Sequence, residues 1–290
     1  MILSEVRMNP SFEFIIERWK VGGICHSVKV SSDKRTARLL LQTVHSKVVF
    51  CRKNFSFFIL PQLLHLYAMS RKSIITVNGV HKSYGPLHVL RGVSLEIPEA
   101  QITAIIGASG AGKSTLMHIM GTLDSPDKGE VFLDEKNVYE LSSKQLAALR
   151  NQSIGFVFQF HHLLPEFTAV ENVCIPAFIA GRKKSESESR AKELLALMGL
   201  KERFKHKPSE LSGGEQQRVA VARALMNSPK IIFADEPSGN LDSANANELH
   251  ALIQKLCAEL NQTFVLITHN PDLTSVAHRV LAMKDGQIAA

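Results

Sequence analysis

Residues 107–115, called the phosphate loop below, carry the side chains and spacing needed to bind phosphate groups. They read Gly-Ala-Ser-Gly-Ala-Gly-Lys-Ser-Thr, which fits the pattern G-x-x-x-x-G-K-[ST] between an apolar run and a helical pattern. Glycines let successive backbone amides turn inward toward an anion. The lysine adds a positive charge at the phosphates, and the serine hydroxyl suits a Mg²⁺ ion. The predicted nucleotide-binding residues here are Gly107, Ser109, Gly110, Gly112, Lys113, Ser114 and Thr115.

Two adjacent carboxylates, Asp235 and Glu236, follow the apolar run Ile231–Ala234. A carboxylate at the end of a buried strand suits a Mg²⁺ ion, directly or through water. Its neighbour Glu236 is placed to act as general base toward an attacking water, a role worth ~10²–10⁴-fold in rate. Either carboxylate alone could simply cap a strand. Together with the phosphate loop, the pair predicts hydrolysis of a bound nucleotide.

A second phosphate-binding pattern lies about 100 residues further along the chain. Residues 211–218 read Leu-Ser-Gly-Gly-Glu-Gln-Gln-Arg, and apolar side chains then recur at helical spacing. Free amides and a hydroxyl at the start of a helix form an anion site. Ser212, Gly213 and Gly214 are therefore predicted to contact phosphate, and we call these three residues the signature turn.

The elements that must position these residues follow from the apolar pattern. Four apolar runs of strand length each end beside a candidate residue. The runs are Ile102–Ile106, Ile154–Phe158, Ile231–Ala234 and Thr263–Ile267, and they are followed by Gly107, Gln159, Asp235 and Thr268-His269. Nearly unbroken apolar strands are typical of a parallel sheet covered on both faces. Ligands of such sheets bind beyond the carboxyl ends of the strands, where all four candidates fall.

Helical patterns lie between these apolar runs. They cover Lys113–Gly121, Glu186–Met198, Glu215–Asn227 and Ala244–Leu260. Shorter strand patterns lie at Ile74–Val77, Val93–Ile97 and Glu130–Leu133. The alternation of strands and helices predicts an α/β fold.

With these motifs in this order, residues 69–290 resemble the ABC ATPase family. The family signature Leu-Ser-Gly-Gly-Gln reads Leu-Ser-Gly-Gly-Glu here, which is a common variant. The resemblance implies a P-loop NTPase of the ABC type: a RecA-like parallel-sheet core, an antiparallel β-subdomain, and an α-helical subdomain inserted at approximately residues 160–225. It also implies that ATP and Mg²⁺ are the cofactors.

The resemblance also implies a role for single residues. Tyr84 would stack on the adenine, Gln159 would be the Q-loop residue, and His269 would lie at the γ-phosphate, although Tyr84 or His269 taken alone would be read as structural. The implied catalytic residues are Glu236, His269 and Gln159, and the implied metal ligands are Ser114, Gln159 and Asp235. Residues 238–242 are expected to cross between two copies of the chain. The copies would pair head to tail, with each ATP between the phosphate loop of one and the signature turn of the other.

The segment Phe160–Val173, called the fingerprint segment below, reads Phe-His-His-Leu-Leu-Pro-Glu-Phe-Thr-Ala-Val-Glu-Asn-Val. It resembles the ATPase subunits of the lipoprotein-releasing systems of Gram-negative bacteria. This implies a homodimer that binds integral membrane permease subunits at the cytoplasmic face of the inner membrane and acts on lipoproteins only indirectly. Because this region contacts the membrane subunit in ABC ATPases, its amino-acid sequence is expected to reflect which partner the chain binds rather than how it hydrolyses ATP. An ATPase of the macrolide-export or cell-division type is the alternative.

Other classes of protein fit the sequence less well. A soluble ABC protein of ribosomes usually carries two ATPase halves, and one of DNA repair inserts a long coiled coil, whereas this chain has one half and no heptad insertion. The intact Lys113, Glu236 and His269 disfavour a scaffold with inactive nucleotide chemistry. His161 and His162 lack further ligands at usable spacing, so metal binding there is not expected.

The charge distribution argues against a nucleic-acid surface. The net charge is +7, but residues 1–68 alone hold ten Lys or Arg against four Asp or Glu, so the remainder is nearly neutral. We expect residues 1–68 to lie outside the ATPase domain, residues 69–290, with Met69 as the initiator; a basic tail on an acidic membrane surface is the alternative. No stretch reaches the roughly 18–20 apolar residues of a membrane span, and Phe55–Met69 comes nearest. Four scattered cysteines favour a reducing, cytoplasmic setting.

Overall fold

The computed structural model of the 290-residue chain describes residues 6–8, 14–21, 24–30, 72–269 and 271–289. It divides the chain into two compact units, Met1–Ser70 and Arg71–Ala290. In the first unit, the described residues form an antiparallel sheet of β1 (Val6–Met8), β2 (Phe14–Val21) and β3 (Ile24–Val30). No pattern in the sequence predicted an element there. The expected initiator Met69 and the apolar stretch Phe55–Met69 lie outside the described residues.

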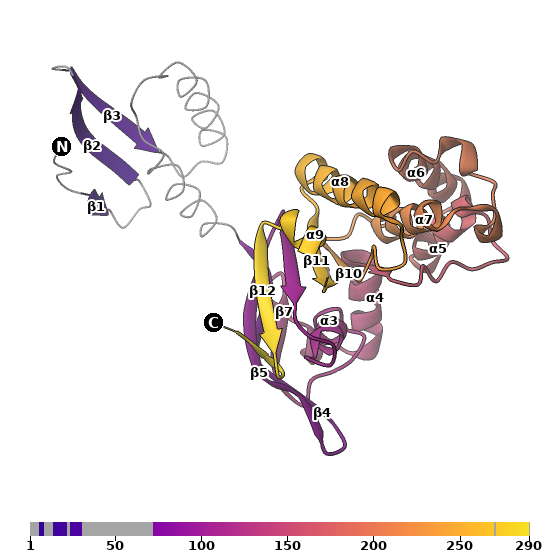
Figure 1. Ribbon diagram of the computed structural model, residues 1–290, viewed down its shortest axis with the longest axis horizontal. Helices are drawn as coiled ribbons and strands as arrows, with labels where there is room; N and C mark the ends of the chain where they lie inside the picture. Colours follow the sequence, from indigo (N-terminus) through magenta and orange to yellow (C-terminus); the bar gives the residue numbers. More distant parts are fainter. Residues whose placement is uncertain (1–5, 9–13, 22–23, 31–71, 270, 290) are drawn as a thin grey trace. The chain divides into compact units, whose positions relative to one another are not determined.

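A mostly parallel sheet forms the centre of the second unit (Figure 1). Its strand order is β13-β12-β6-β11-β10-β9, and only β13 is antiparallel to its neighbour. The strands are β6 (Ile102–Ile106), β9 (Ile154–Phe158), β10 (Ile231–Asp235), β11 (Thr263–Thr268), β12 (Arg279–Lys284) and β13 (Gln287–Ile288). The central strands β6, β10 and β11 are buried along almost their whole length. The parallel sheet predicted from the unbroken apolar runs is therefore confirmed.

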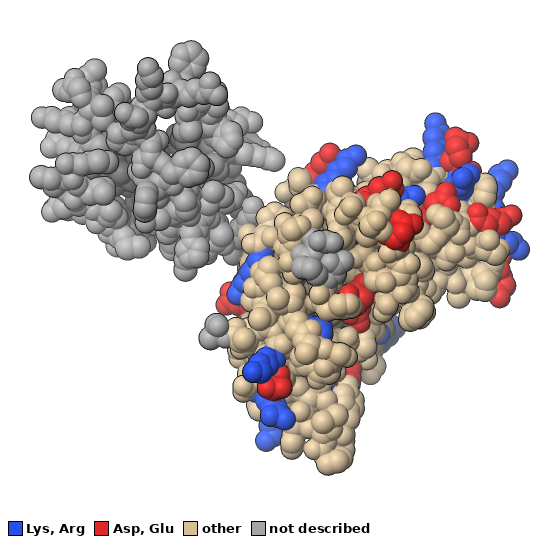
Figure 2. All heavy atoms as spheres, viewed as in Figure 1, with Lys and Arg blue, Asp and Glu red and all other residues tan. Residues whose placement is uncertain are grey.

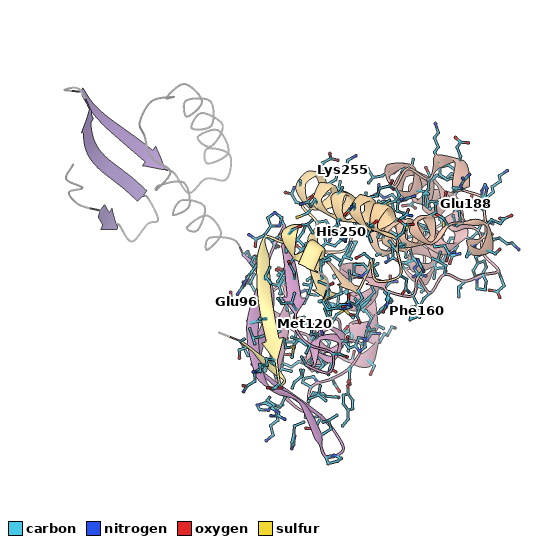
Figure 3. The ribbon with its side chains drawn as sticks, in the orientation of Figure 1. Glu96, Met120, Phe160, Glu188, His250 and Lys255 are labelled. Carbon is cyan, nitrogen blue, oxygen red and sulfur yellow. The ribbon has the colours of Figure 1, made fainter. Side chains whose placement is uncertain are left out.

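An antiparallel sheet with the strand order β5-β4-β7-β8 packs beside the parallel one. Its strands are β4 (Ser73–Tyr84), β5 (Leu87–Pro98), β7 (Lys128–Leu133) and β8 (Lys136–Asn137). Helix α3 (Lys113–Met120) lies in the apolar core shared by the two sheets, where the side chains of Leu116, Met117, Ile119 and Met120 are fully buried (Figure 3 labels Met120). The helix that follows the phosphate loop is thus fixed by packing on several sides.

Helices α5 (Ala169–Ile179), α6 (Lys184–Leu197) and α7 (Gly213–Leu225) pack together at the end of the unit opposite β4 and β5 (Figure 1). They share a second apolar core with α8 (Ser243–Leu260) and the parallel sheet. The α-helical subdomain of the expected fold is therefore present. Helix α5 was not predicted, because apolar side chains cover most of its circumference and Pro176 lies inside it, so the sequence shows no amphipathic period there.

The remaining elements connect these layers. They are α4 (Ser143–Ser153), α9 (Pro271–Ser275) and the short 3-10 helices η1 (Val138–Glu140), η2 (Lys201–Arg203) and η3 (Pro208–Glu210). Helix α4 begins with a capping box, in which the Ser142 hydroxyl accepts from the Gln145 amide. Because none of its residues is fully buried, it gave no apolar pattern to detect.

Along the part of the chain that the structure describes, no helix is both long enough and apolar enough to cross a lipid bilayer. Acidic and basic side chains are interspersed on the face of the second unit drawn in Figure 2. This agrees with the nearly neutral charge of the sequence beyond residue 68.

Candidate active site

The carboxyl ends of the parallel strands align at one edge of the sheet. The register pairs Asp235 of β10 with Phe158 of β9 and with Ile267 of β11. On the other side of β11, Thr268 pairs with Ile106 of β6. The residues that follow these strand ends are the sequence-predicted Gly107, Gln159, Glu236 and His269. The strand ends, and with them these four residues, therefore share one edge of the sheet.

The phosphate loop turns from β6 into α3 through left-handed backbone at Gly110 (φ 78°) and Gly112 (φ 100°). Side chains rarely adopt these angles, so glycine is favoured at both positions. Gly107 is required for a different reason: a Cβ built there would lie 2.2 Å from the carbonyl oxygen of Met283 in β12. The tip of the loop, which includes Ser109, is exposed to solvent.

Lys113 and Ser114 begin α3 and point their polar groups to the site. The Lys113 ammonium donates to the carbonyl oxygens of Gly107 and Ala108, both at 2.9 Å, so it lies over the loop. The Ser114 hydroxyl lies beside the Asp235 carboxyl. Burial raises the pKa of the Asp235 carboxyl above its ordinary value, against the lowering effect of that hydroxyl. A hydroxyl beside one carboxylate is the protein ligand set that Mg²⁺ uses when phosphates and water supply the rest, so these two residues fit the ion.

Glu236 is held by the end of β11. Its backbone has the left-handed conformation (φ 44°), which is uncommon for a residue with a side chain and clusters at functional sites. Its carboxylate accepts from the Thr268 hydroxyl at 3.0 Å and from the His269 amide at 2.9 Å, and the His269 Nδ1 atom lies 2.6 Å from Oε1. The His269 side chain is 78% exposed, whereas that of Glu236 is 17% exposed. Two of the three sequence-predicted catalytic residues thus touch.

Gln159, the third of the predicted metal ligands, is hydrogen-bonded to the loop 238–242. Its Nε2 atom donates to Oδ1 of Asn240 at 3.0 Å, and Nδ2 of Asn240 donates back to the Gln159 carbonyl at 3.2 Å. A Cβ at Gly239 would lie 3.0 Å from the same Gln159 amide nitrogen. Here the Gln159 amide is bound by the loop expected to cross between subunits, while Ser114 and Asp235 lie beside each other.

Tyr84, the expected adenine platform, is part of a cluster at the end of β4. Its hydroxyl donates to Oδ2 of Asp124 at 2.6 Å, and the Thr115 side chain of α3 lies nearby. Lys82 donates to Oδ1 of Asp124 at 2.8 Å and lies over the Tyr84 ring, 5.2 Å from its centroid. The hydrogen bond to Asp124 raises the pKa of Tyr84. The residue remains 49% exposed, so part of the ring is open to a base.

The signature turn opens α7 with a capping box. The Ser212 hydroxyl accepts from the Glu215 amide at 3.2 Å, and the Glu215 carboxylate accepts from the Ser212 amide at 2.8 Å. The Ser212 hydroxyl also lies against the Glu215 carboxylate, so an incoming anion would compete with that carboxylate for the hydroxyl hydrogen. The amides of Gly213 and Gly214 lie in the first turn, where the helix supplies no acceptor for them. Ser212 and Gly213 are exposed, as an anion site requires.

The backbone of the signature turn lies close to α8 and to the loop before it. A Cβ at Gly214 would lie 2.2 Å from Oδ1 of Asn245, and one at Gly213 would lie 3.7 Å from the Leu241 side chain. Glycine at 214 is therefore required by the close approach of α8. In Figure 1, α7 lies apart from α3, so one chain carries its two phosphate-binding elements in separate places.

Some of these contacts had no signal in the sequence. Asp124, which holds Tyr84, and Asn240, which holds Gln159, were not among the predicted site residues. Both are ordinary polar residues in loops, and nothing in their local pattern shows which distant side chain they contact.

Comparisons with known proteins agree with this geometry. A profile described as ABC transporter matches residues 90–239. The lipoprotein-releasing system ATP-binding protein LolD of Bacteroides fragilis (strain YCH46) is 57% identical over 215 residues, which covers 74% of this chain and 100% of that protein. LolD of Porphyromonas gingivalis (strain ATCC BAA-308 / W83) is 53% identical over 213 residues, covering 73% of this chain and 97% of that protein.

Solved structures share the fold. A dimeric post-hydrolysis state of the ATP-binding cassette MJ0796, bound to ADP and Pi, aligns with a TM-score of 0.69 at 40% identity and covers 74% of this chain and 97% of that chain. CbiO1 from Clostridium perfringens, part of the ABC transporter complex cbiONQ, aligns with a TM-score of 0.70 at 29% identity, covering 75% and 87%. The expected fold of a RecA-like core with antiparallel and helical subdomains is confirmed. This chain therefore belongs to the ABC transporter family, as one of its ATP-hydrolysing, nucleotide-binding subunits.

Proposed function

We propose that this chain powers an ABC transporter that releases acylated lipoproteins from the inner membrane toward the outer membrane. The observation that carries this proposal is the 57% identity, over the full length of the relative, to an ATP-binding protein of a lipoprotein-releasing system. On this proposal the chain is peripheral, at the cytoplasmic face of the inner membrane. It reaches the lipoprotein only through integral permease subunits.

The hydrolytic step is assigned to the edge of the parallel sheet. The phosphate loop and Lys113 bind the phosphates of ATP, and Ser114 and Asp235 are the residues that would hold Mg²⁺. When bound, this ion would neutralise phosphate charge. Glu236, held by Thr268 and the His269 backbone, orients the attacking water and accepts its proton. The exposed His269 ring is assigned to the γ-phosphate.

Two copies of the chain are proposed to enclose two ATP molecules. The signature turn is exposed and equipped to donate to phosphate, yet α7 lies apart from α3 in the same chain (Figure 1). A second copy arranged head to tail brings each signature turn to the other chain's phosphate loop. The relative MJ0796 is dimeric in its ADP- and Pi-bound structure, which supports this arrangement.

The fingerprint segment is proposed to bind the permease. It exposes Phe160 (66%, labelled in Figure 3), Leu164 (42%) and Phe167 (41%) within one short stretch. Exposed apolar side chains gathered in this way are typical of surfaces that bind another protein. A permease segment that buries them would connect hydrolysis to movement in the membrane.

The experiment that tests the proposal is purification of the tagged chain from gently solubilised native membranes. We expect a permease pair to accompany it, and a photo-cross-linker in acylated lipoprotein to label that pair but not this chain. Proteoliposomes of the complex should release lipoprotein to a soluble acceptor when ATP is added, and a complex with Glu236→Gln should not. Recovery of an efflux permease with a periplasmic adaptor, or of division proteins, would overturn the substrate and favour the alternative.

A further inference from the structure

The fingerprint segment has an inward side as well as the exposed one described above. Its second residue, His161, is only partly exposed, unlike Phe160 before it. The Nε2 atom of His161 lies 2.9 Å from the carbonyl oxygen of Gly213, the middle residue of the signature turn. One side chain therefore joins the segment assigned to the permease with the turn assigned to the partner's ATP.

The chemistry of this contact fixes its direction. A carbonyl oxygen only accepts, so the ring nitrogen Nε2 of His161 must carry the hydrogen and donate it. Burial lowers the pKa of His161, so the ring is neutral at neutral pH, and the contact with Gly213 selects the tautomer protonated at Nε2. The bond is therefore present in the neutral form of the histidine.

The backbone of the same segment, and the end of β9 just before it, are also attached to α7. Arg223 donates to the carbonyl oxygens of His161 and His162, at 2.8 and 2.7 Å. Nearer the start of the helix, Gln217 donates to the carbonyl oxygen of Phe158 at 3.3 Å. These bonds hold residues 158–162 along the length of α7. The contact from His161 is the one that reaches the first turn.

The first turn is where a small change in orientation matters most. Ser212 and the amides of Gly213 and Gly214 must meet the partner's phosphate together, and hydrogen bonds weaken steeply with misalignment. Asn245 closes off one side of this turn at Gly214, and the His161 ring contacts the Gly213 carbonyl. Without the N–H donor of the His161 ring, the turn loses a hydrogen bond that comes from outside α7.

We propose that His161 is a positioning residue, which orients the signature turn toward the partner's nucleotide and joins it to the permease-binding segment. This inference rests on the proposed nucleotide-sandwich dimer. It also alters the expectation that the fingerprint segment serves partner choice only. Its exposed apolar residues contact the permease, and its partly buried histidine acts on the nucleotide sandwich.

The test separates binding of ATP to one chain from ATP-dependent dimerisation. In a Glu236→Gln background, where hydrolysis does not consume the ATP-bound dimer, the dimer dissociation constant is measured by sedimentation in saturating ATP and Mg²⁺. His161→Phe removes the donor and keeps a ring of similar size. Because a dimer contains two such contacts, each worth roughly two- to tenfold, we expect the dissociation constant to rise about tenfold or more. The affinity of dilute, monomeric protein for ATP should not change.

Matched variants distinguish this role from a general effect on folding. His161→Gln, whose amide nitrogen takes the place of Nε2, should restore dimerisation, and the shorter His161→Asn should not. His162→Asn changes the adjacent exposed histidine, whose ring lies edge-on to Phe158, and tolerates its left-handed backbone (φ 48°), so its ATP-dependent dimerisation should match that of the parent protein. If a thermal scan shows that His161→Phe is unfolded, the comparison is made between His161→Gln and His161→Asn.

Three outcomes would overturn the inference. One is a His161→Phe dimer as tight as the parent, and another is an equal loss of ATP affinity in the monomer. The third is failure of the Glu236→Gln parent itself to dimerise with ATP, which would overturn the proposed sandwich as well. If the parent protein dimerises with ATP and the His161 variants dimerise equally well, only this inference is overturned and the proposed sandwich stands.

Discussion

At the scale of single residues, hydrogen bonds between protein groups position the side chains at the active-site edge without any help from a nucleotide. Glu236 is fixed by hydrogen bonds from Thr268 and His269, and Gln159 by hydrogen bonds with Asn240. Charged groups positioned in this way need little rearrangement when substrate binds, which is the condition under which electrostatic catalysis is most effective.

The first prediction concerns the proposed base. Glu236→Gln should lower the rate of ATP hydrolysis by ~10²–10⁴-fold, because the amide cannot accept the proton of the attacking water. Its side chain still accepts from Thr268, so ATP binding should persist. Phosphate release measures the first effect and equilibrium dialysis of ATP the second. A variant that hydrolyses ATP at the parent rate would contradict the assignment of the base.

A second prediction concerns the cluster around Tyr84. Burial acts to raise the pKa of Asp124, but hydrogen bonds from Lys82 and Tyr84 together lower it below its ordinary value, so this carboxylate is charged at neutral pH and anchors the ring. Asp124→Ala should weaken ATP binding about two- to tenfold, since base stacking is worth ~0.5–1.5 kcal/mol. Inorganic tripolyphosphate, which has no base, should bind as before.

Two comparisons make this prediction specific. Tyr84→Ala should lose as much ATP affinity as Asp124→Ala, because both remove the same platform. Glu130→Gln, at an exposed carboxylate on β7, should lose none. An equal loss of tripolyphosphate binding would mean that Asp124 supports the phosphate loop instead.

At the scale of elements, the loop between β9 and α5 owes its shape to one buried amide. Asn172 is fully buried in α5. Its Oδ1 atom accepts from the Leu164 amide at 2.8 Å, and its Nδ2 atom donates to the carbonyl oxygens of Leu164, Phe167 and Thr168 at 3.0–3.1 Å. A loop with no regular structure is thus held in one conformation, and its apolar side chains are displayed at its surface.

Removing that amide should destabilise the helical subdomain. Asn172→Ala removes the side-chain partner of the Leu164 amide and the Phe167 carbonyl, whereas the Leu164 and Thr168 carbonyls still accept from backbone amides. Each buried unsatisfied group costs about 1–3 kcal/mol. We expect the free energy of unfolding to fall by about 2–4 kcal/mol in urea titrations, allowing for water reaching part of the loop. Asn247→Ala, at an exposed position of α8, is the control and should change little. A drop of the same size in both variants would argue against this role.

At the scale of the whole molecule, the chain consists of two compact units. All the candidate site residues lie in the second unit, Arg71–Ala290. The relative from Bacteroides fragilis matches over 215 residues and over its full length, while it covers 74% of this chain. The ATPase therefore occupies about the length of chain that the second unit provides.

The fourth prediction follows from this division. We propose that residues 69–290 form the ATPase domain and that a chain beginning at Met69 folds and hydrolyses ATP like the full one. Thermal unfolding and phosphate release from the two proteins, compared side by side, measure this. Loss of activity in the shorter chain would show that residues 1–68 support the fold or the site. Binding of only the longer chain to anionic vesicles would favour the basic-tail alternative.

The sequence by itself determined the chemistry of this protein. The phosphate loop, the carboxylate pair and the signature turn each lie within a few consecutive residues, so their local spacing was enough to identify them. Strand-length apolar runs that end beside candidate residues also predicted the shared edge, because parallel strands place their carboxyl ends together. The helix α5 and the strand β12 were missed, since neither shows the period of an amphipathic element clearly enough.

Only the tertiary structure decided how these groups are held. Tyr84 meets Asp124 across 40 residues, Gln159 meets Asn240 across 81, and His161 meets Gly213 across 52. No local pattern encodes such pairs, because they depend on how the sheets and the helical subdomain pack. A histidine whose neighbours indicated partner choice proved to contact the signature turn, and packing of the segment against α7 is the physical reason.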